Sequence, residues 1–153
     1  MLWYEEECVR SCATDAPVVC MASWGAEAWL CTAGRTLFRL TGGGGQLRLQ
    51  RVLQYTLNEA YDMHVDSEHV VTAHDFRMLN VFNKRTGASV TVSDPGFVRF
   101  TSLATCGAST LLALDSDKLL FFDTTTGADK QLHAPINKKF FAVAGITDNT
   151  FIL

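Results

Sequence analysis

Residues 61 to 87 read YDMHVDSEHVVTAHDFRMLNVFNKRTG, and residues 101 to 127 read TSLATCGASTLLALDSDKLLFFDTTTG. The second stretch lies 40 positions after the first and aligns with it without a gap, so that both end on Thr-Gly. Similar apolar residues coincide along the alignment: Met63 with Leu103, Val71 with Leu111, Ala73 with Ala113, Leu79 with Leu119, and Phe82 with Phe122. Because chance similarity rarely holds one phase for so long, the sequence predicts an internal repeat of about 40 residues.

The pattern continues in both directions from these two copies. Forty positions after Leu111-Leu112 come Phe151-Ile152, and 41 positions before Val70-Val71 come Trp29-Leu30. One small insertion or deletion therefore separates the first copy from the second. Three copies and the start of a fourth account for the chain.

Each copy has the features of four short strands joined by polar turns. In the second copy the expected strands are 61–65, 69–73, 78–82 and 88–92. Alternation is weak in segments such as 119–122, which is typical of strands covered on both faces. No segment has a clear 3.6-residue apolar period, although 55–63 is ambiguous. The sequence thus predicts an all-β protein.

Four-stranded units of about 40–45 residues are typical of β-propeller blades, and the repeat here resembles that of the WD40 family. Asp75 and Asp115 follow the second strand where that family has an Asp turn, and Phe122-Asp123 stands where it has Trp-Asp. Thr86-Gly87 and Thr126-Gly127 resemble the hairpin loop that comes next. The chain departs from the family in having no Trp-Asp dipeptide and no Gly-His opening a blade. The resemblance implies a partial β-propeller of four-stranded antiparallel blades, with Asp75, Asp115, Gly87 and Gly127 as structural turn residues.

We expect a single partial propeller over residues 1–153. The approximate blades are 17–55, 59–93 and 97–134, with the start of the next at 138–153 and a possible outer strand of a preceding blade at 1–16. Propellers have about 4–8 blades, so this chain would leave apolar blade faces and strand edges open. Three explanations are open: the chain is a fragment, a second copy or a different chain completes the ring, or an open stack docks on a large assembly.

The composition limits the partners and the compartment. The chain is 48% hydrophobic and 19% charged, with a formal net charge of -3, and it has no basic stripe. This is a globular balance that gives no reason to expect a nucleic-acid partner. The N-terminus lacks the features of a signal peptide, and no apolar run reaches about 18 residues. We therefore expect no membrane partner and a cytoplasmic or nuclear location.

No group of residues forms a convincing catalytic, cofactor or metal motif. The cysteines lack the paired spacing of zinc sites or disulfide frameworks, and we interpret them as free thiols; they are Cys8, Cys12, Cys20, Cys31 and Cys106. Gly42 to Gly45 precede a strand-like segment, which favours a hairpin loop over a phosphate-binding loop. His64, His69 and His74 are spaced by five, which in strands puts successive side chains on opposite faces. The sequence predicts no catalytic residue, no cofactor, no metal and no evident small-molecule substrate.

The leading functional hypothesis is a non-catalytic protein-protein interaction scaffold, acting as a subunit or adaptor in a larger assembly. Aromatic and arginine side chains often dominate such contacts. By their turn positions, the candidate partner-binding residues are Trp24, Phe76, Arg77 and Phe97. The adjacent pair Lys84-Arg85 is expected to be a solvated loop.

The alternative is a propeller-based hydrolase or lyase with a site in the central channel. Such a site would need acidic and basic side chains on the first strands of several blades. Asp62 and His64 are the acid and the base that these predicted strands offer.

Overall fold

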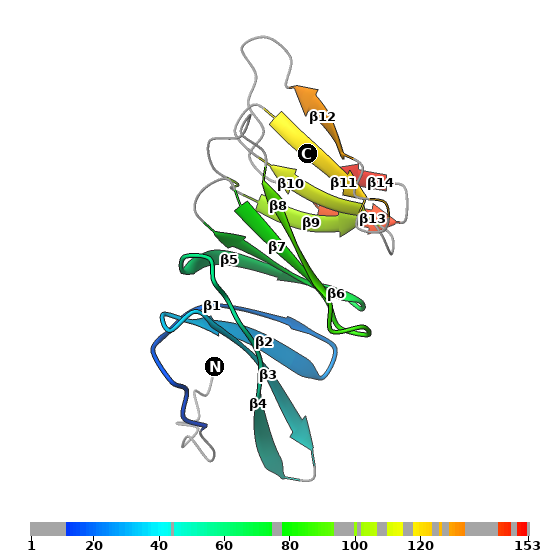
Figure 1. The fold of residues 1–153 in the computed structure, drawn as a ribbon. Helices are drawn as coiled ribbons and strands as arrows, with labels where there is room; N and C mark the ends of the chain where they lie inside the picture. Colours follow the sequence, from blue (N-terminus) through cyan, green and yellow to red (C-terminus); the bar gives the residue numbers. More distant parts are fainter. Residues whose placement is uncertain are drawn as a thin grey trace, which may run out of the picture.

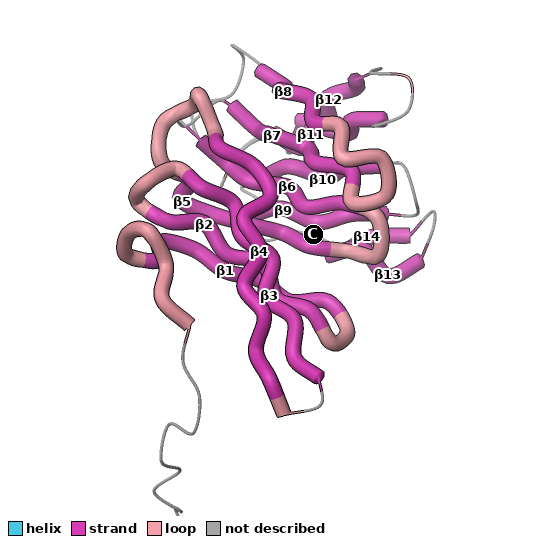
Figure 2. The backbone as a smooth tube through the Cα atoms, turned by 60° about the horizontal axis from the view of Figure 1, so that its bottom comes forward, coloured by secondary structure: helices cyan, strands magenta, loops and turns pink. Residues whose placement is uncertain are grey.

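The computed structural model describes residues 12–43, 45–74, 78–93, 100, 102–106, 110–114, 118–123, 126, 129–133, 144–147 and 150–152 (Figure 1). Within these ranges the regular secondary structure consists of strands, with no helix, and loops lie mainly at the strand connections (Figure 2). No helix that could cross a membrane is present in the described part of the chain.

Three four-stranded sheets follow one another along the chain. Blade 1 contains β1 (Val18–Trp24), β2 (Glu27–Thr32), β3 (Thr36–Gly43) and β4 (Gln46–Gln54). Blade 2 contains β5 (Ala60–Val65), β6 (His69–His74), β7 (Met78–Asn83) and β8 (Ser89–Ser93). Blade 3 contains β9 (Ser102–Cys106), β10 (Thr110–Leu114), β11 (Lys118–Asp123) and β12 (Asp129–His133). The strands β13 (Ala144–Thr147) and β14 (Thr150–Ile152) pair in a further two-stranded sheet.

Each blade keeps its strands in chain order, and every neighbouring pair is antiparallel. The blades follow one another from the bottom to the top of Figure 1, and the first strands of successive sheets contact one another: β1 with β5, β5 with β9, and β9 with β13. Sheets that radiate from adjacent first strands are the arrangement of a β-propeller. The prediction of an all-β partial propeller with four-stranded antiparallel blades is confirmed.

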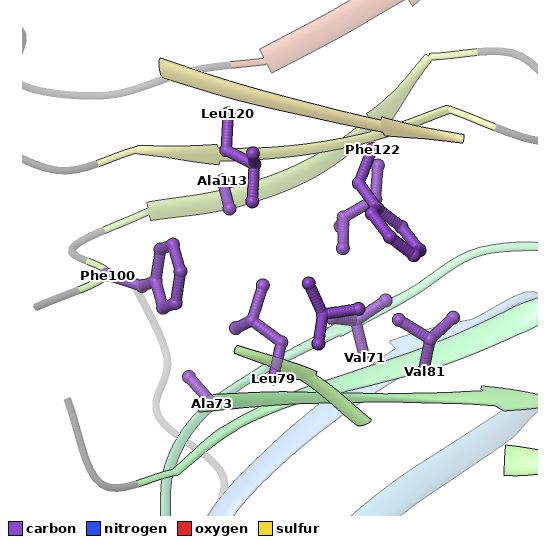
Figure 3. Packing of buried hydrophobic residues seen from close by; sticks show 10 residues of the cluster. Val71, Ala73, Leu79, Val81, Phe100, Ala113, Leu120 and Phe122 are labelled. Atoms are coloured by element: carbon purple, nitrogen blue, oxygen red, sulfur yellow. The ribbon is translucent and has the colours of Figure 1, made fainter. Parts of the chain in front are cut away.

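The core is divided between the two inter-blade interfaces. Between blades 2 and 3, the side chains of β6 and β7 face those of β10 and β11, with Phe100 beside them (Figure 3). This cluster consists of Val71, Ala73, Leu79, Val81, Val92, Phe100, Leu111, Ala113, Leu120 and Phe122. The cluster between blades 1 and 2 consists of Trp29, Cys31, Leu37, Tyr55, Ala60, Met63, Val65, Val70 and Phe82.

The ladder pairings show that the gapless repeat alignment is out of register by one residue in the second strand of the blade. Val65 pairs with Val70, whereas Thr105, which lies 40 positions after Val65, pairs with Leu111. The structural equivalent of Leu111 is therefore Val70 and not Val71. Val71 faces blade 3 and Leu111 faces blade 2, because a one-residue shift moves a strand residue to the opposite face.

Candidate interaction surface

Of the predicted partner-binding residues, Trp24 is described by the structure. It ends β1, and its side chain is 51% exposed. The next residue, Gly25, has a φ of 59° and turns the chain toward β2. Tryptophan side chains are frequent anchors of protein interfaces, and this one is open to a partner.

The other predicted residues are placed as follows. Gly87 lies in the turn between β7 and β8 with a φ of 74°, a conformation that glycine adopts without a steric cost. The remaining predicted binding and turn residues lie outside the described part of the chain: Phe76, Arg77, Phe97, Asp75, Asp115 and Gly127.

Directly opposite Trp24 in the β1–β2 ladder lies Glu27, whose carboxylate joins blade 1 to blade 2. Arg39 of β3 forms an ion pair with it, with 2.7 Å between Nη2 and Oε2. Lys84, which follows β7, donates hydrogen bonds from Nζ to Oε1 of Glu27 and to the main-chain oxygen of Asp66. One carboxylate is thus held between an arginine of its own blade and a lysine of the next blade.

The ring of Trp29 lies beside the same two cations. Cζ of Arg39 is 5.8 Å and Nζ of Lys84 is 5.7 Å from its ring centroid, which is within cation–π range. On blade 2, the ring of Phe82 packs against Trp29 with 5.8 Å between centroids. Trp29 is 2% exposed, and its indole Nε1 is buried without a hydrogen-bond partner. The interface therefore contains a buried donor that no described protein group satisfies.

These residues line a groove of about 460 Å³ between blades 1 and 2. Its other lining residues are Gln50 and Val52 from β4, Ser67 and Glu68 from the β5–β6 turn, and Arg85. The volume is within the range of ligand pockets, and polar side chains surround an aromatic floor. The groove can therefore hold a short segment of another molecule.

The charges of the lining favour an acidic ligand. Two carboxylates and three cations line the groove, whereas the whole chain is acidic. Arg39 and Lys84 are engaged by Glu27, but exposed Arg85 takes part in none of the ion pairs formed by the described residues. Arg85 is thus the cation best placed to meet an incoming carboxylate.

The pKa of the Glu27 carboxyl lies below its ordinary value. Burial alone would raise its pKa, but the hydrogen bond from Lys84, the nearby indole N–H of Trp29 and the charges of Lys84 and Arg39 outweigh it. The indole acts through proximity, since its geometry is not that of a hydrogen bond. Glu27 is therefore a fixed negative charge at neutral pH and not a proton donor.

A polar network is buried deeper in the same interface. The hydroxyl of Thr72 lies 3.1 Å from the hydroxyl of Tyr55 and 2.8 Å from Nε2 of His74. Nδ1 of His74 lies 2.6 Å from the main-chain oxygen of Asn58, and since that oxygen only accepts, Nδ1 carries a proton. Each side chain of the network has a partner, which indicates a structural role.

The three evenly spaced histidines lie on two strands. His64 belongs to β5, while His69 and His74 begin and end β6. His69 is buried, with Nδ1 3.6 Å from a carboxylate oxygen of Asp66. Within the described residues, no group of three His, Cys, Asp or Glu side chains is placed to hold a metal ion.

The sequence did not indicate the groove. The prediction that Lys84-Arg85 is solvated is correct for Arg85 but wrong for Lys84, whose side chain is 12% exposed. Lys84 is buried because Glu27, 57 positions earlier, lies across the interface. No local pattern encodes a contact of that range.

Comparisons with known proteins support the fold. No protein-family model matches the sequence, and no curated protein matches it. The structure of the RRP9 WD40 repeats covers 88% of the chain with a TM-score of 0.66 and 7% identity. The WD40 domain of Neurospora crassa Pan2 covers 84% with a TM-score of 0.59 and 14% identity. The computationally designed Ika4 protein covers 97% with a TM-score of 0.66 and 18% identity.

The chain covers different fractions of the matched structures. The chain spans 44% of the RRP9 structure and 41% of the Pan2 domain, but 91% of the designed protein. At these identities the likeness defines the fold. The chain therefore has the fold of a portion of a WD40-like β-propeller, as the sequence pattern predicted.

Proposed function

We propose that the chain is a non-catalytic protein-interaction module that serves as a subunit or adaptor in a larger assembly. The observation that carries this proposal is the exposed indole of Trp24, directly opposite Glu27, which lines the groove between blades 1 and 2. Tryptophan and arginine are enriched among the residues that dominate binding at protein interfaces, and Arg85 of the groove forms no ion pair with any described residue. Propellers of the WD40 kind generally mediate protein-protein contacts, which agrees with it.

The proposed ligand is an acidic segment of a partner protein. Its carboxylate would pair with Arg85 and its apolar side chain would cover Trp24. Phe76, Arg77 and Phe97 remain proposed additional contacts. We also propose that the chain acts in the cytoplasm or the nucleus and has no membrane partner.

The hydrolase or lyase alternative gains no support from the first strands. Asp62 of β5 accepts a hydrogen bond from the main-chain N–H of Met63, at 2.8 Å. Burial lowers the pKa of His64, although the charges of Asp66 and Asp62 oppose the shift. A single strand contributes both groups, whereas a channel site would draw on several blades.

A library of random peptides displayed on phage tests the binding role. Peptides selected on the full chain should be rich in acidic and apolar residues. Their affinity, measured by calorimetry, should fall at least about tenfold with Trp24→Ala and with Arg85→Ala, which is the loss of a contact of about 1.4 kcal/mol.

The matched control is Val90→Thr, which changes another exposed apolar residue, 53% exposed on β8, away from the groove. Its affinity for the selected peptides should equal that of the wild type. Equal binding by all four proteins, or no enriched peptide, would overturn the proposal.

A second candidate surface is the apolar face of blade 1 that is turned away from blade 2. On the face of blade 1 turned away from blade 2, Met21 is 61% and Leu47 is 38% exposed, and Leu40 and Leu49 on that face are half-buried. Because propeller blades bury such faces against neighbouring blades, we propose that a blade of a second copy of this chain covers it. The chain spans 44% and 41% of two WD40 structures, so a second copy would supply blades toward a ring of that size.

Light scattering after size-exclusion chromatography tests this second surface. The full chain should associate as its concentration rises, and Met21→Glu with Leu47→Glu should suppress the association. A wild-type monomer at every concentration would contradict the proposal, as would unchanged association of the variant.

A further inference from the structure

Two cysteines face each other in blade 1. Cys20 of β1 and Cys31 of β2 are direct partners in the antiparallel ladder. Their side chains lie on the same face of the sheet, since directly opposed strand residues point the same way. Opposed residues have Cα atoms about 4.5 or 5.5 Å apart, and both values are within the range of about 4.4–6.8 Å that a disulfide requires.

The two thiols are unequal in exposure. Cys31 is 1% exposed and belongs to the cluster between blades 1 and 2, whereas Cys20 is half-buried at its edge. A small oxidant can therefore reach Cys20 but not Cys31. Cys12, by contrast, is exposed before β1 and provides an internal reference thiol.

The two thiols are also unequal in acidity. A hydrogen bond from the Cys31 thiol lowers the pKa of Cys20, against the effects of burial and of the charges of Asp62 and Glu59. The same hydrogen bond and burial raise the pKa of Cys31. The accessible thiol is thus the one that more readily becomes the nucleophilic thiolate.

We propose that Cys20 and Cys31 form an oxidisable pair that closes to a cross-strand disulfide on reaction with a hydroperoxide. With hydrogen peroxide, the Cys20 thiolate attacks one oxygen, the O–O bond breaks, and the departing hydroxide takes a proton to become water. Cys20 is then a sulfenic acid. The sulfur of Cys31 attacks that of Cys20, the S–O bond breaks, and hydroxide leaves with the Cys31 proton as a second water. Two thiols lose two electrons and the peroxide gains them.

The disulfide would act on the structure around it. It would tie β1 to β2 four residue pairs from the Trp24–Glu27 pair, whose Glu27 lines the groove. It would also remove the contact between the Cys31 thiol and the Tyr55 hydroxyl. The pair thus places a redox-sensitive link within the interface between blades 1 and 2. This inference does not depend on the proposed binding function.

The test is thiol mapping on the full chain. The native protein is treated with hydrogen peroxide, remaining thiols are alkylated, and the non-reduced digest is analysed by mass spectrometry. We expect a cross-linked peptide pair joining Cys20 to Cys31, two hydrogens lighter than the reduced pair, that forms before Cys12 is consumed. Reduction should restore both thiols.

Two variants of Cys31 separate the oxidation of Cys20 from the closure of the disulfide, and a variant of Cys12 is the control. Cys31→Ser should abolish the cross-link and leave Cys20 as a sulfenic acid that dimedone traps. Cys31→Ala should also abolish the cross-link, with slower oxidation of Cys20 because the hydrogen bond that lowers its pKa is gone, and it introduces no buried hydroxyl if the serine variant fails to fold. Cys12→Ser should leave the cross-link unchanged. Oxidation of Cys12 while Cys20 and Cys31 stay reduced would overturn the proposal, as would cross-linking of Cys20 to any other cysteine.

Discussion

The interface between blades 2 and 3 is built differently from the one between blades 1 and 2. Among the described residues, apolar side chains such as Leu79, Leu111 and Phe122 form most of it (Figure 3), and the Tyr61 hydroxyl donates a hydrogen bond to the main-chain oxygen of Phe100. The one between blades 1 and 2 adds an ion-pair clamp at Glu27 and a hydrogen-bonded network at Thr72. It also carries the groove.

The two interfaces therefore contribute differently to the stability of the fold and to the specificity of binding. Apolar burial holds blades together without fixing what else binds there, because the hydrophobic effect is not directional. Charges and hydrogen bonds are directional, and the ion pairs of Glu27 with Arg39 and Lys84 fix charged groups at the groove. We infer that the interface between blades 2 and 3 serves mainly stability, and the one between blades 1 and 2 serves recognition as well.

The largest expected effect is at the apolar interface. Leu79 is fully buried between blades 2 and 3, so Leu79→Ala removes buried apolar contacts and leaves a cavity. We expect the free energy of unfolding to fall by about 2–5 kcal/mol, measured by urea denaturation. Peptide affinity of the protein that remains folded should not change. A loss below about 1 kcal/mol, comparable to that of a surface substitution, would mean that the blades are not packed here.

The next effect is at the ion-pair clamp. Glu27→Gln leaves the nearly buried ammonium of Lys84 without its carboxylate, and we expect a loss of about 1–3 kcal/mol in the free energy of unfolding. The double variant with Lys84→Met should recover part of the loss, since it removes the stranded charge. If the two single changes were additive in a double-mutant cycle, no clamp would exist.

The same clamp predicts a dependence on pH. The folded-state pKa of Glu27 is below its ordinary value of 4.5, so its contribution to stability is complete above that pH. The contribution is lost as the pH falls through the folded-state pKa. Acid denaturation of Glu27→Gln should lack this component. A difference in stability between the two proteins that stayed constant from neutral to acid pH would contradict the assignment.

A smaller effect is expected in the polar network. Thr72→Val keeps the shape of the side chain but removes the hydroxyl that contacts both Tyr55 and His74. The loss should be about 1–2 kcal/mol, measured by thermal and urea unfolding. Tyr55→Phe in the Thr72→Val background should cost less than it does in the wild type, because the two groups share a contact.

The smallest effect is at the turn after β7. Gly87→Ala places a Cβ at a φ of 74°, and since no atom lies within 4 Å of that Cβ, the cost is backbone strain alone. We expect about 1 kcal/mol. Gly43→Ala is the matched control, because its Cβ also meets nothing within 4 Å and no positive φ is involved. Equal effects of the two substitutions would exclude strain at Gly87.

Much of the fold was predictable because it depends on local pattern. The repeat of four short segments predicted the blades, and Thr86-Gly87 marked a turn that requires positive φ. The sheet faces were less predictable. A gapless alignment equates Val71 with Leu111, yet compensating one-residue changes in the flanking turns put them on opposite faces. Apolar residues on both faces of these strands conceal such a shift.

The candidate interaction surface was predictable only where it depends on one residue. The position of Trp24 before a glycine indicated an exposed aromatic, and its side chain is exposed. The groove depends on pairs distant in sequence, such as Glu27 with Lys84. Burial of Lys84 follows from blade packing, which no local window of sequence contains.

Amide hydrogen exchange of the full chain, with and without a library-selected peptide, tests most directly whether the interface between blades 1 and 2 is the binding surface. The account predicts that the peptide slows exchange at the β1–β2 turn next to Trp24 and at the β5–β6 and β7–β8 turns next to Ser67 and Arg85. Protection concentrated on β8 to β12, with exchange at these turns unchanged, would contradict it.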